Sequence, residues 1–201
     1  VTSPGGLWDS SKKIYSHVKG CYPLKTPKLH WIFPSGASVN FAHLGSDSDC
    51  LSWQGSQITM VGFDELTHFS EYQFFYMLSR NRTDSGISSY VRATCNPDAD
   101  SWVAEFIKWW IDQDTGYPIS ERSGKVRWMV RLNEVICWFD TKQEAILAAL
   151  ETGMDYEKAE IMVKSVTFIA STLQDNKILM KNDPGYMANL MALTEVERER
   201  L

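Results

Sequence analysis

The sequence predicts an α/β protein in which helices flank a sheet that is parallel at its centre. Two observations predict this class. Short apolar runs rich in β-branched and aromatic residues alternate with segments of helical spacing, and polar residues follow directly where two of these runs end. With 201 residues, 44% of them hydrophobic, the chain can bury a sizeable core in one domain, or in one domain with a small appendage.

The first predicted elements are a helix and a hairpin. Residues 7–19 carry apolar side chains at helical spacing and end at Gly20, a residue type that commonly stops a helix. Residues 28–33 and 37–43 are aromatic and β-branched, and the Pro-Ser-Gly sequence between them predicts a tight turn. Residues 44–57 are polar and contain glycine, which predicts a loop.

The centre of the chain is predicted to alternate strand, helix and strand. The apolar run 58–63 predicts a strand, and residues 70–80 predict a helix capped by Ser70. Residues 90–95 predict the next strand, which Pro97 ends because proline cannot donate to a ladder. Ligands of parallel sheets bind at the carboxyl ends of the strands, so the polar residues that follow these two runs are candidates for a site.

The second half is predicted to consist of helices, a further hairpin and a strand. The segments are a helix over 101–111 capped by Ser101, a loop over 112–124, strands over 125–130 and 134–138, helices over 140–150 and 155–163, and a strand over 164–170. The last thirty residues are expected to form short helices and turns around the Asp-Pro-Gly sequence that begins at Asp183.

Charge and cysteine content narrow the function classes. The net charge of -5 argues against a protein that binds nucleic acid over its whole surface. Residues 1–40 hold five Lys against one acid, and residues 134–201 hold twelve acids against seven bases. Either the basic end faces a polyanion, or the asymmetry is a chance feature of a solvated surface. The four cysteines lack C-x-x-C spacing, which favours a reducing cytoplasm, and no apolar run is long enough to span a membrane.

Two adjacent acids at the end of an apolar strand suit phosphoryl transfer. Asp64 can bind magnesium and Glu65 can orient or deprotonate an attacking water, whereas the simpler alternative is that both cap the next helix. Thr94 and Asn96 end the next predicted strand, where an amide can sense a γ-phosphate, although Asn-Pro also favours an ordinary turn. His68 has no second His or Cys close by, which favours an ordinary surface or core histidine.

The phosphate-binding pattern G-x-x-x-x-G-K-[ST] is absent from the sequence. The Gly124-Lys125 pair is followed by valine and lies before a predicted hairpin rather than between a strand and a helix. A basic segment with Trp128 interleaved surrounds this pair, and its members are Arg122, Lys125, Arg127 and Arg131. The segment either contacts a DNA backbone or is an ordinary solvated hairpin.

The ordered motifs resemble those of the large subunit of tailed-phage and prophage terminases. Residues 58–69 resemble the Walker B segment of that family, and residues 91–98 resemble its coupling motif, with a helix and residues 79–82 between them. Further segments similar to the family are 4–8, 33–37 and 168–176. The resemblance covers essentially the whole chain, and the ordered set is more specific than any single motif.

The resemblance implies the ATPase domain of a motor that packages viral DNA in the bacterial host cytoplasm. The fold would be an ASCE-type P-loop NTPase sheet flanked by helices, incomplete at its N-terminal end and with peripheral β-hairpins. Residues 1–170 would be the ATPase domain without its Walker A segment. Residues 171–201 would be its helical end, or a linker toward an absent RNase H-like nuclease domain.

The resemblance also implies roles for single residues. Asp64 would bind Mg²⁺, and Glu65 would be the catalytic carboxylate for ATP hydrolysis in the complete protein. Thr94 and Asn96 would couple the nucleotide state to movement. Two further pairs complete the set: Gln54 and Gln57 at the rim of the active site, and Arg80 and Arg82, one of which would approach the phosphates of a neighbouring subunit. The implied partners are double-stranded DNA, the terminase small subunit, the capsid portal and further copies of the chain in a ring.

Two rival hypotheses stay open. In relatives the phosphate-binding loop lies upstream of the segment that begins here, so we expect this chain alone neither to bind ATP tightly nor to hydrolyse it. The chain would be either a trimmed portion of the protein or a prophage remnant. The first rival to the ATPase hypothesis is a non-catalytic assembly fragment that keeps only the fold. The second is a two-metal nuclease, which needs carboxylates converging on two ions about 4 Å apart. Its candidate ligands are Asp47, Asp49, Asp64 and Asp98.

Overall fold

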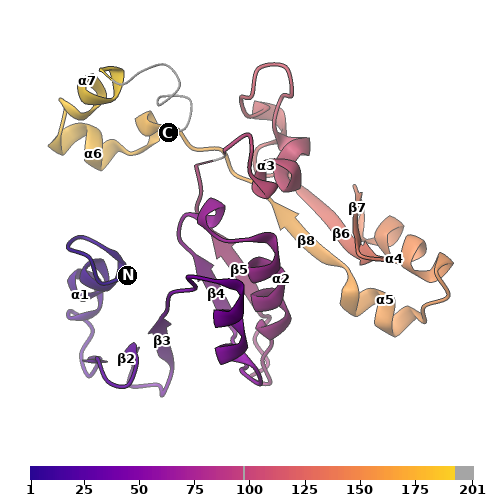
Figure 1. The fold of residues 1–201 in the computed structure, drawn as a ribbon, viewed down its shortest axis with the longest axis horizontal. Coiled ribbons are helices and arrows are strands. Elements are labelled where there is room, and N and C mark those ends of the chain that lie inside the picture. The colour runs from indigo at the N-terminus through magenta and orange to yellow at the C-terminus, as the bar shows by residue number, and fades with distance from the viewer. Residues whose placement is uncertain (97, 193–201) are drawn as a thin grey trace. The chain divides into compact units, whose positions relative to one another are not determined.

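The computed structural model describes residues 1–96 and 98–192. The chain forms two compact units, Val1–Thr94 and Cys95–Leu201 (Figure 1). Both units combine helices with short strands, so the α/β class predicted from the sequence is confirmed.

The first unit begins with a helix and an antiparallel sheet. These elements are α1 (Leu7–Tyr15), β1 (Tyr22–Leu24), β2 (Leu29–Ile32) and β3 (Ser38–Phe41). Trp31 is 2% exposed, and its indole N–H donates to the Ser11 hydroxyl of α1 at 2.9 Å. The β2–β3 hairpin is confirmed, whereas β1 was not predicted. Helix α1 ends at Tyr15 instead of residue 19, because Val18 is exposed and provides no buried anchor beyond that point.

Residues 44–57, predicted as a loop, contain the 3-10 helix η1 (Asp47–Trp53). Ser46 and Asp49 form its capping box, and the N–H groups of Ser46 and Gly45 hold the pKa of the Asp49 carboxyl below its usual range. Cys50 is the buried residue of η1, and burial raises the pKa of its thiol. The loop prediction was wrong because a short helix with one buried residue has no periodic apolar pattern.

The predicted strand, helix and strand at the centre of the chain are present as β4 (Met60–Phe63), α2 (Glu71–Arg80) and β5 (Tyr90–Ala93). β4 and β5 pair in parallel, and α2 covers the face where Phe63 contacts Phe74. Ser70 caps α2 as predicted. Its hydroxyl accepts the N–H of Gln73 at 3.1 Å and donates to Asp47 of η1 at 2.6 Å. This serine therefore joins the start of α2 to η1.

The second unit is built on an antiparallel sheet with helices on both faces. Its strands lie in the order β7 (Val135–Phe139), β6 (Val126–Leu132) and β8 (Lys164–Thr167). Helices α4 (Lys142–Glu151) and α5 (Tyr156–Met162) cover one face, where Ile146 packs with Val130. On the other face Trp138 contacts Phe106 of α3 (Trp102–Ile107) and Trp110. Strand β6 extends to Leu132, two residues beyond the predicted end of the strand at residue 130. The hairpin therefore turns at Asn133 and Glu134, which both have positive φ.

Shorter helices complete the described chain. They are η2 (Leu66–His68), η3 (Lys108–Trp110), η4 (Ser120–Arg122), η5 (Leu173–Asp175), α6 (Lys177–Asn182) and α7 (Tyr186–Met191). The part of the predicted helical end over 193–201 lies outside the described residues. The longest helices of the described ranges are α2 and α4, with 10 residues each. A bilayer-spanning helix needs about 20 apolar residues, so none of the described helices can cross a membrane.

The prediction of one sheet, parallel at its centre, differs from the structure. The strands of the described residues form three sheets, of which β4–β5 alone is parallel. The connections explain the difference. Tight turns join β2 to β3 and β6 to β7, which requires antiparallel pairing, whereas α2 crosses from β4 to β5 and permits parallel pairing.

We predict that Ser70→Ala lowers the free energy of unfolding by about 1–2 kcal/mol, because the substitution removes both the helix cap and the hydrogen bond to Asp47. Urea unfolding followed by tryptophan fluorescence measures the change. Ser88→Ala, in the exposed loop before β5, is the matched control and should leave the midpoint unchanged. Equal midpoints for the two variants would contradict the prediction.

Candidate active site

The parallel pairing of β4 and β5 brings the two candidate strand ends together. Phe63 and Ala93 are register partners, so Asp64 and Thr94 leave the sheet side by side. The Thr94 N–H donates to the Phe63 carbonyl at 3.0 Å, and the Thr94 carbonyl accepts the N–H of Leu66 at 2.7 Å. The backbone ladder therefore continues past the last paired residues.

The side chain of Thr94 joins both acids. Its hydroxyl donates to Asp64 Oδ1 at 3.2 Å and accepts the backbone N–H of Glu65 at 3.3 Å. Asp64 and Thr94 are exposed, and Glu65 is half-buried. Asp64 thus presents a carboxylate to solvent while one of its oxygens is held, and Thr94 is positioned to respond to any ligand that Asp64 binds.

Glu65 has a strained backbone. Its φ of 58° and ψ of 67° lie in the left-handed region, which a residue with a long side chain seldom occupies. The surrounding contacts keep it there, because Leu66 is 5% exposed and its N–H is bonded to Thr94. The positive φ marks a turn of the backbone directly after β4. The alternative that these acids merely cap a helix gains no support, since η2 has no side-chain cap and α2 is capped by Ser70.

The other residues implied by the resemblance lie at different places. Asn96 is exposed and follows Thr94 by two residues, on the same exit from β5. Gln54 directly follows η1, and Gln57 precedes β4 by three positions. Their place at the rim of the Asp64 site stays a prediction. Residues 80–82 lie on the side where β4 begins, because the Arg80 carbonyl accepts the Ile58 N–H at 3.0 Å.

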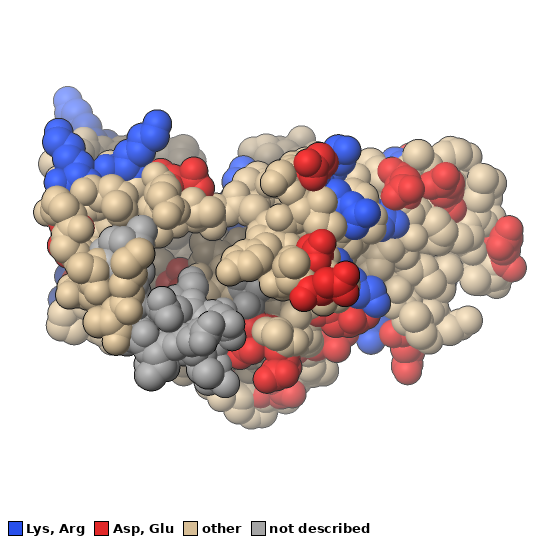
Figure 2. All heavy atoms as spheres, turned by 90° about the horizontal axis from the view of Figure 1, so that it is seen from above, with Lys and Arg blue, Asp and Glu red and all other residues tan. Residues whose placement is uncertain are grey.

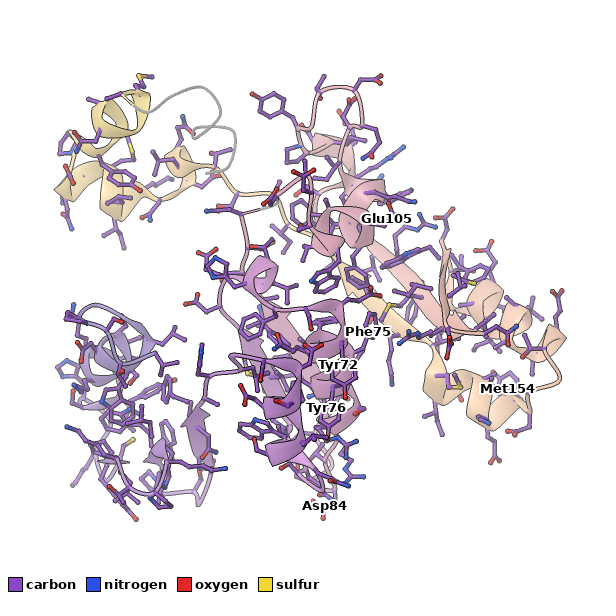
Figure 3. The ribbon with its side chains drawn as sticks, viewed as in Figure 1. Tyr72, Phe75, Tyr76, Asp84, Glu105 and Met154 are labelled. Carbon is purple, nitrogen blue, oxygen red and sulfur yellow. The ribbon has the colours of Figure 1, made fainter. Side chains whose placement is uncertain are left out.

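Arg80 and Arg82 are therefore separated from Asp64 by the length of β4. The strand has four residues and a strand rises about 3.3 Å per residue, so the separation exceeds about 10 Å. Arg80 stacks on Tyr76 of α2, with 5.0 Å from its guanidinium carbon to the ring centroid. The loop that follows Arg82 reaches the same end of the pair, where Figure 3 labels Asp84. Neither arginine can serve the Asp64 of its own chain.

Among the described residues, the acids proposed for a two-metal nuclease form no metal-binding cluster. Within the described residues no group of three His, Cys, Asp or Glu side chains can hold a metal ion. Asp47 accepts the Ser70 hydroxyl, Asp49 caps η1, and Asp98 accepts the Asp100 N–H at 3.1 Å. His68 lies exposed in η2. The nuclease hypothesis therefore lacks the carboxylate cluster that it requires.

A single carboxylate still fits magnesium. Mg²⁺ keeps several waters and commonly takes one or two carboxylates together with substrate phosphates, rather than an all-protein cage. The exposed carboxylate of Asp64, held from one side by the Thr94 hydroxyl, matches that donor set.

The Gly124-Lys125 pair does not form a phosphate-binding loop. The Gly124 N–H donates to the Phe168 carbonyl at 2.8 Å, and the following residues enter strand β6 instead of a helix. The Lys125 carbonyl accepts the Trp110 indole N–H and the Thr167 hydroxyl, both at 3.1 Å. The backbone of this pair is thus occupied in joining β6 to its neighbours.

The basic segment divides into two pairs. Arg122 and Arg127 both stack on Trp109, each with 4.8 Å from the guanidinium carbon to the ring centroid. Arg127 is only 12% exposed and forms an ion pair with Asp140 at 3.1 Å. Lys125 and Arg131 are exposed. On the face drawn in Figure 2, Lys and Arg side chains lie in small groups with acids on the same face.

Trp128 does not belong to the basic surface, although the sequence interleaves it with the arginines. It packs against the core formed by α4 and α5, because neighbouring residues of β6 alternate between the two faces. The aromatic partner of the arginines is Trp109, from a different part of the sequence. An aromatic residue before the basic segment was visible in the sequence, but its stacking depends on the tertiary fold.

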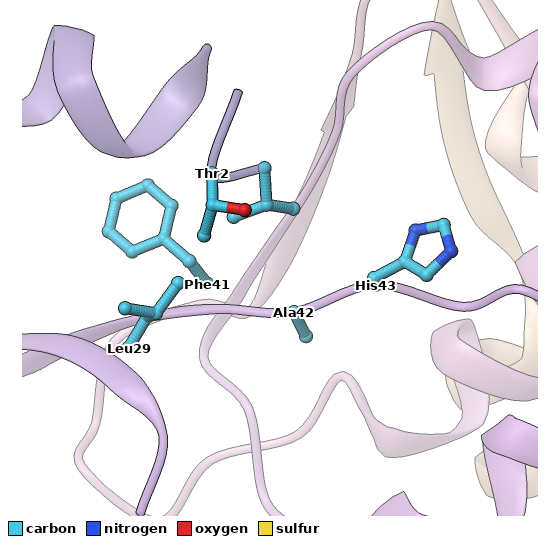
Figure 4. Close-up of a pocket in the computed structure, with 6 residues that line it drawn as sticks. Thr2, Leu29, Phe41, Ala42 and His43 are labelled. Carbon is cyan, nitrogen blue, oxygen red and sulfur yellow. The ribbon is translucent and has the colours of Figure 1, made fainter. Parts of the chain in front are cut away.

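A separate depression lies beside β2 and β3. Its volume is about 410 Å³, and Leu29, Phe41, Ala42 and His43 line it together with the first two residues of the chain (Figure 4). None of the predicted site residues is among them. The depression therefore adds nothing to the candidate active site.

A known protein family matches most of the chain. The family described as "Terminase large subunit, T4likevirus-type, N-terminal" matches residues 17–201. The chain belongs to this family. No curated protein and no solved structure matches it. Membership of the terminase large subunit family confirms the resemblance recognised in the sequence and connects the chain with phage DNA packaging.

We predict that Arg127→Ala lowers the free energy of unfolding of this terminase chain by about 1–3 kcal/mol, because it removes packing on Trp109 and the hydrogen bond from Arg127 Nε to the Phe139 carbonyl. Lys125→Ala keeps every backbone contact of its position and should change stability by less than about 0.5 kcal/mol. Chemical unfolding of both variants measures the difference. A loss of equal size in both would refute a structural role specific to Arg127.

Proposed function

We propose that the chain is part of the ATPase of a viral DNA packaging motor, with its hydrolytic site at the ends of β4 and β5. The observation that carries this proposal is the hydrogen bond from Thr94 to Asp64 across two parallel strand ends. Parallel sheets bind their ligands at this edge. Membership of the terminase family supplies the context of DNA packaging.

Asp64 is the proposed magnesium ligand. Held by this carboxylate, Mg²⁺ would supply positive charge that offsets the charge developing on the transferred phosphate. The protein contributes an exposed carboxylate whose orientation the Thr94 hydroxyl restrains. Restraint of this kind matters because catalysis in this reaction class depends on positioning and electrostatic stabilisation.

Glu65 is the proposed base. It follows Asp64 directly, and its carboxylate would orient the attacking water and accept its proton. The left-handed backbone of Glu65 supports this role, because strained residues persist where a precise side-chain direction is needed.

Thr94 and Asn96 are the proposed coupling residues. Thr94 bonds Asp64 with its hydroxyl and Leu66 with its carbonyl, so a displacement at the acid reaches both η2 and the exit of β5. Asn96 lies on that exit. Movement that starts at the nucleotide thus has a short physical route into the rest of the chain.

ATP binding needs a phosphate holder that these 201 residues do not contain, since the pattern G-x-x-x-x-G-K-[ST] is absent. We therefore expect turnover only in the full-length large subunit, with Mg²⁺ and ATP as its cofactor and substrate. Other proposed partners are double-stranded DNA, the small subunit, the portal and further copies in a ring. For such a ring, Arg82 is the better candidate to reach a neighbour's phosphates, because it is exposed whereas Arg80 stacks on Tyr76.

The proposed role of Glu65 can be tested by ATP hydrolysis in the full-length large subunit. Glu65→Gln should leave nucleotide affinity within about threefold and reduce kcat by at least about 100-fold, because the amide keeps the size but cannot accept a proton. Glu71→Gln, on the first turn of α2, is the control and should retain activity. Near-normal turnover of the Glu65 variant would contradict this prediction and move the catalytic role to another residue.

Another prediction concerns DNA. We propose that Lys125 and Arg131 contact the phosphate backbone, whereas Arg122 and Arg127 support the fold. Alanine at Lys125 or Arg131 should lower the slope of log affinity against log salt by about one, because one phosphate contact is lost. Binding of duplex DNA across a salt series gives the slope, with Lys158→Ala on α5 as the control. An unchanged slope in both variants would leave the hairpin with a structural role.

A further inference from the structure

Asn81 connects three segments at the amino end of the β4–β5 pair. Its side-chain nitrogen donates to the carbonyl of Ile58 at 2.9 Å and lies 3.1 Å from the carbonyls of Thr59 and of Tyr90. Asn81 directly follows α2, so one amide group joins the end of that helix to the beginnings of both strands. The side chain is partly buried, which increases the cost of leaving these carbonyls unpaired.

The backbone around Asn81 strengthens the same junction. Its carbonyl accepts the Ser89 hydroxyl at 3.1 Å, and the preceding Arg80 carbonyl accepts the Ile58 N–H at 3.0 Å. The loop between α2 and β5 is thereby closed at both of its ends. The junction fixes where β4 begins relative to β5.

Register is the quantity that this junction controls. The β4–β5 ladder has four paired residues on each strand, and a two-stranded sheet of this size is marginal without contacts at its ends. A slip by one residue would turn every side chain to the other face and would separate Asp64 from Thr94. Thr94 secures the carboxyl end and Asn81 secures the amino end.

We propose that Asn81 is a positioning residue of the ATPase site. It holds the register of β4 against β5 and so keeps Asp64 against Thr94, although it lies at the opposite end of both strands. This inference rests on the proposed function for its catalytic consequence, whereas its structural consequence can be measured without ATP. Aspartate is the sharpest substitution, because it keeps the shape of asparagine but replaces the donor by a charged acceptor that faces three carbonyls.

Hydrogen exchange in the 201-residue chain tests the positioning directly. In Asn81→Asp, the amides of Thr94 and Leu66 should exchange at least about tenfold faster, because their hydrogen bonds open when the register loosens. Asn40→Asp, on the exposed side of β3, makes the same chemical change and should leave both rates unaltered. Unchanged exchange at Thr94 and Leu66 in a folded Asn81→Asp chain would overturn the proposal.

Kinetics of the full-length large subunit test the catalytic consequence. Asn81→Asp should reduce kcat by at least about tenfold with a change in ATP affinity below about threefold, and Asn40→Asp should match the parent. If Asn81→Asp does not fold, Asn81→Ser retains one donor and replaces it in both experiments, with smaller effects in the same direction. Faster exchange with normal kcat would overturn the catalytic role. Failure of Glu65→Gln to reduce hydrolysis, with exchange at Thr94 still accelerated by the Asn81 substitution, would instead reject the proposed function.

Discussion

The parallel pairing of β4 with β5 is the contact on which the candidate site depends. It places Asp64 and Thr94 at one edge, so that a hydroxyl from one strand restrains a carboxylate from the other. The strained turn at Glu65 is tolerated because Leu66 is buried and bonded to the carbonyl of Thr94. Each of these features would be lost if the two strands shifted by one residue.

The central strand pair was accessible from the sequence, since its apolar runs and following polar residues are local signals. The capping serine of α2 was accessible for the same reason, because Ser70 and the backbone N–H of Gln73 that donates to it lie three residues apart. The division of the strands among three sheets was not accessible, because periodicity reports which face of a strand is buried and not which strand lies beside it. The contacts of Asn81 were missed for a related reason, since its acceptors just before β4, Ile58 and Thr59, lie 23 and 22 positions away.

The basic hairpin shows how tertiary structure changes the meaning of a charge pattern. In the sequence, Arg122, Lys125, Arg127 and Arg131 are equivalent candidates for a DNA contact. In the fold, Trp109 lies against two of them and Asp140 neutralises one, so half of the pattern is committed to internal packing. A desolvated guanidinium that already has a carboxylate partner gains little from a phosphate. Lys125 and Arg131 remain exposed, although Arg131 Nε also donates to the Glu134 carbonyl at 3.2 Å, and these two are the residues that we propose for a DNA contact.

The exposure of Asp64 carries a final physical implication. A carboxylate open to water interacts weakly with a nearby cation, because the high dielectric constant of the solvent screens it, and Asp64 and Glu65 together repel a polyphosphate. Effective hydrolysis therefore requires positive groups and a water-excluding cover in addition to the acids. The described edge supplies the orienting contacts, through Thr94 and the Glu65 turn. In the proposed function, β4 and β5 would therefore supply the rigid placement of the acids, and other groups brought to this edge would have to compensate the phosphate charge.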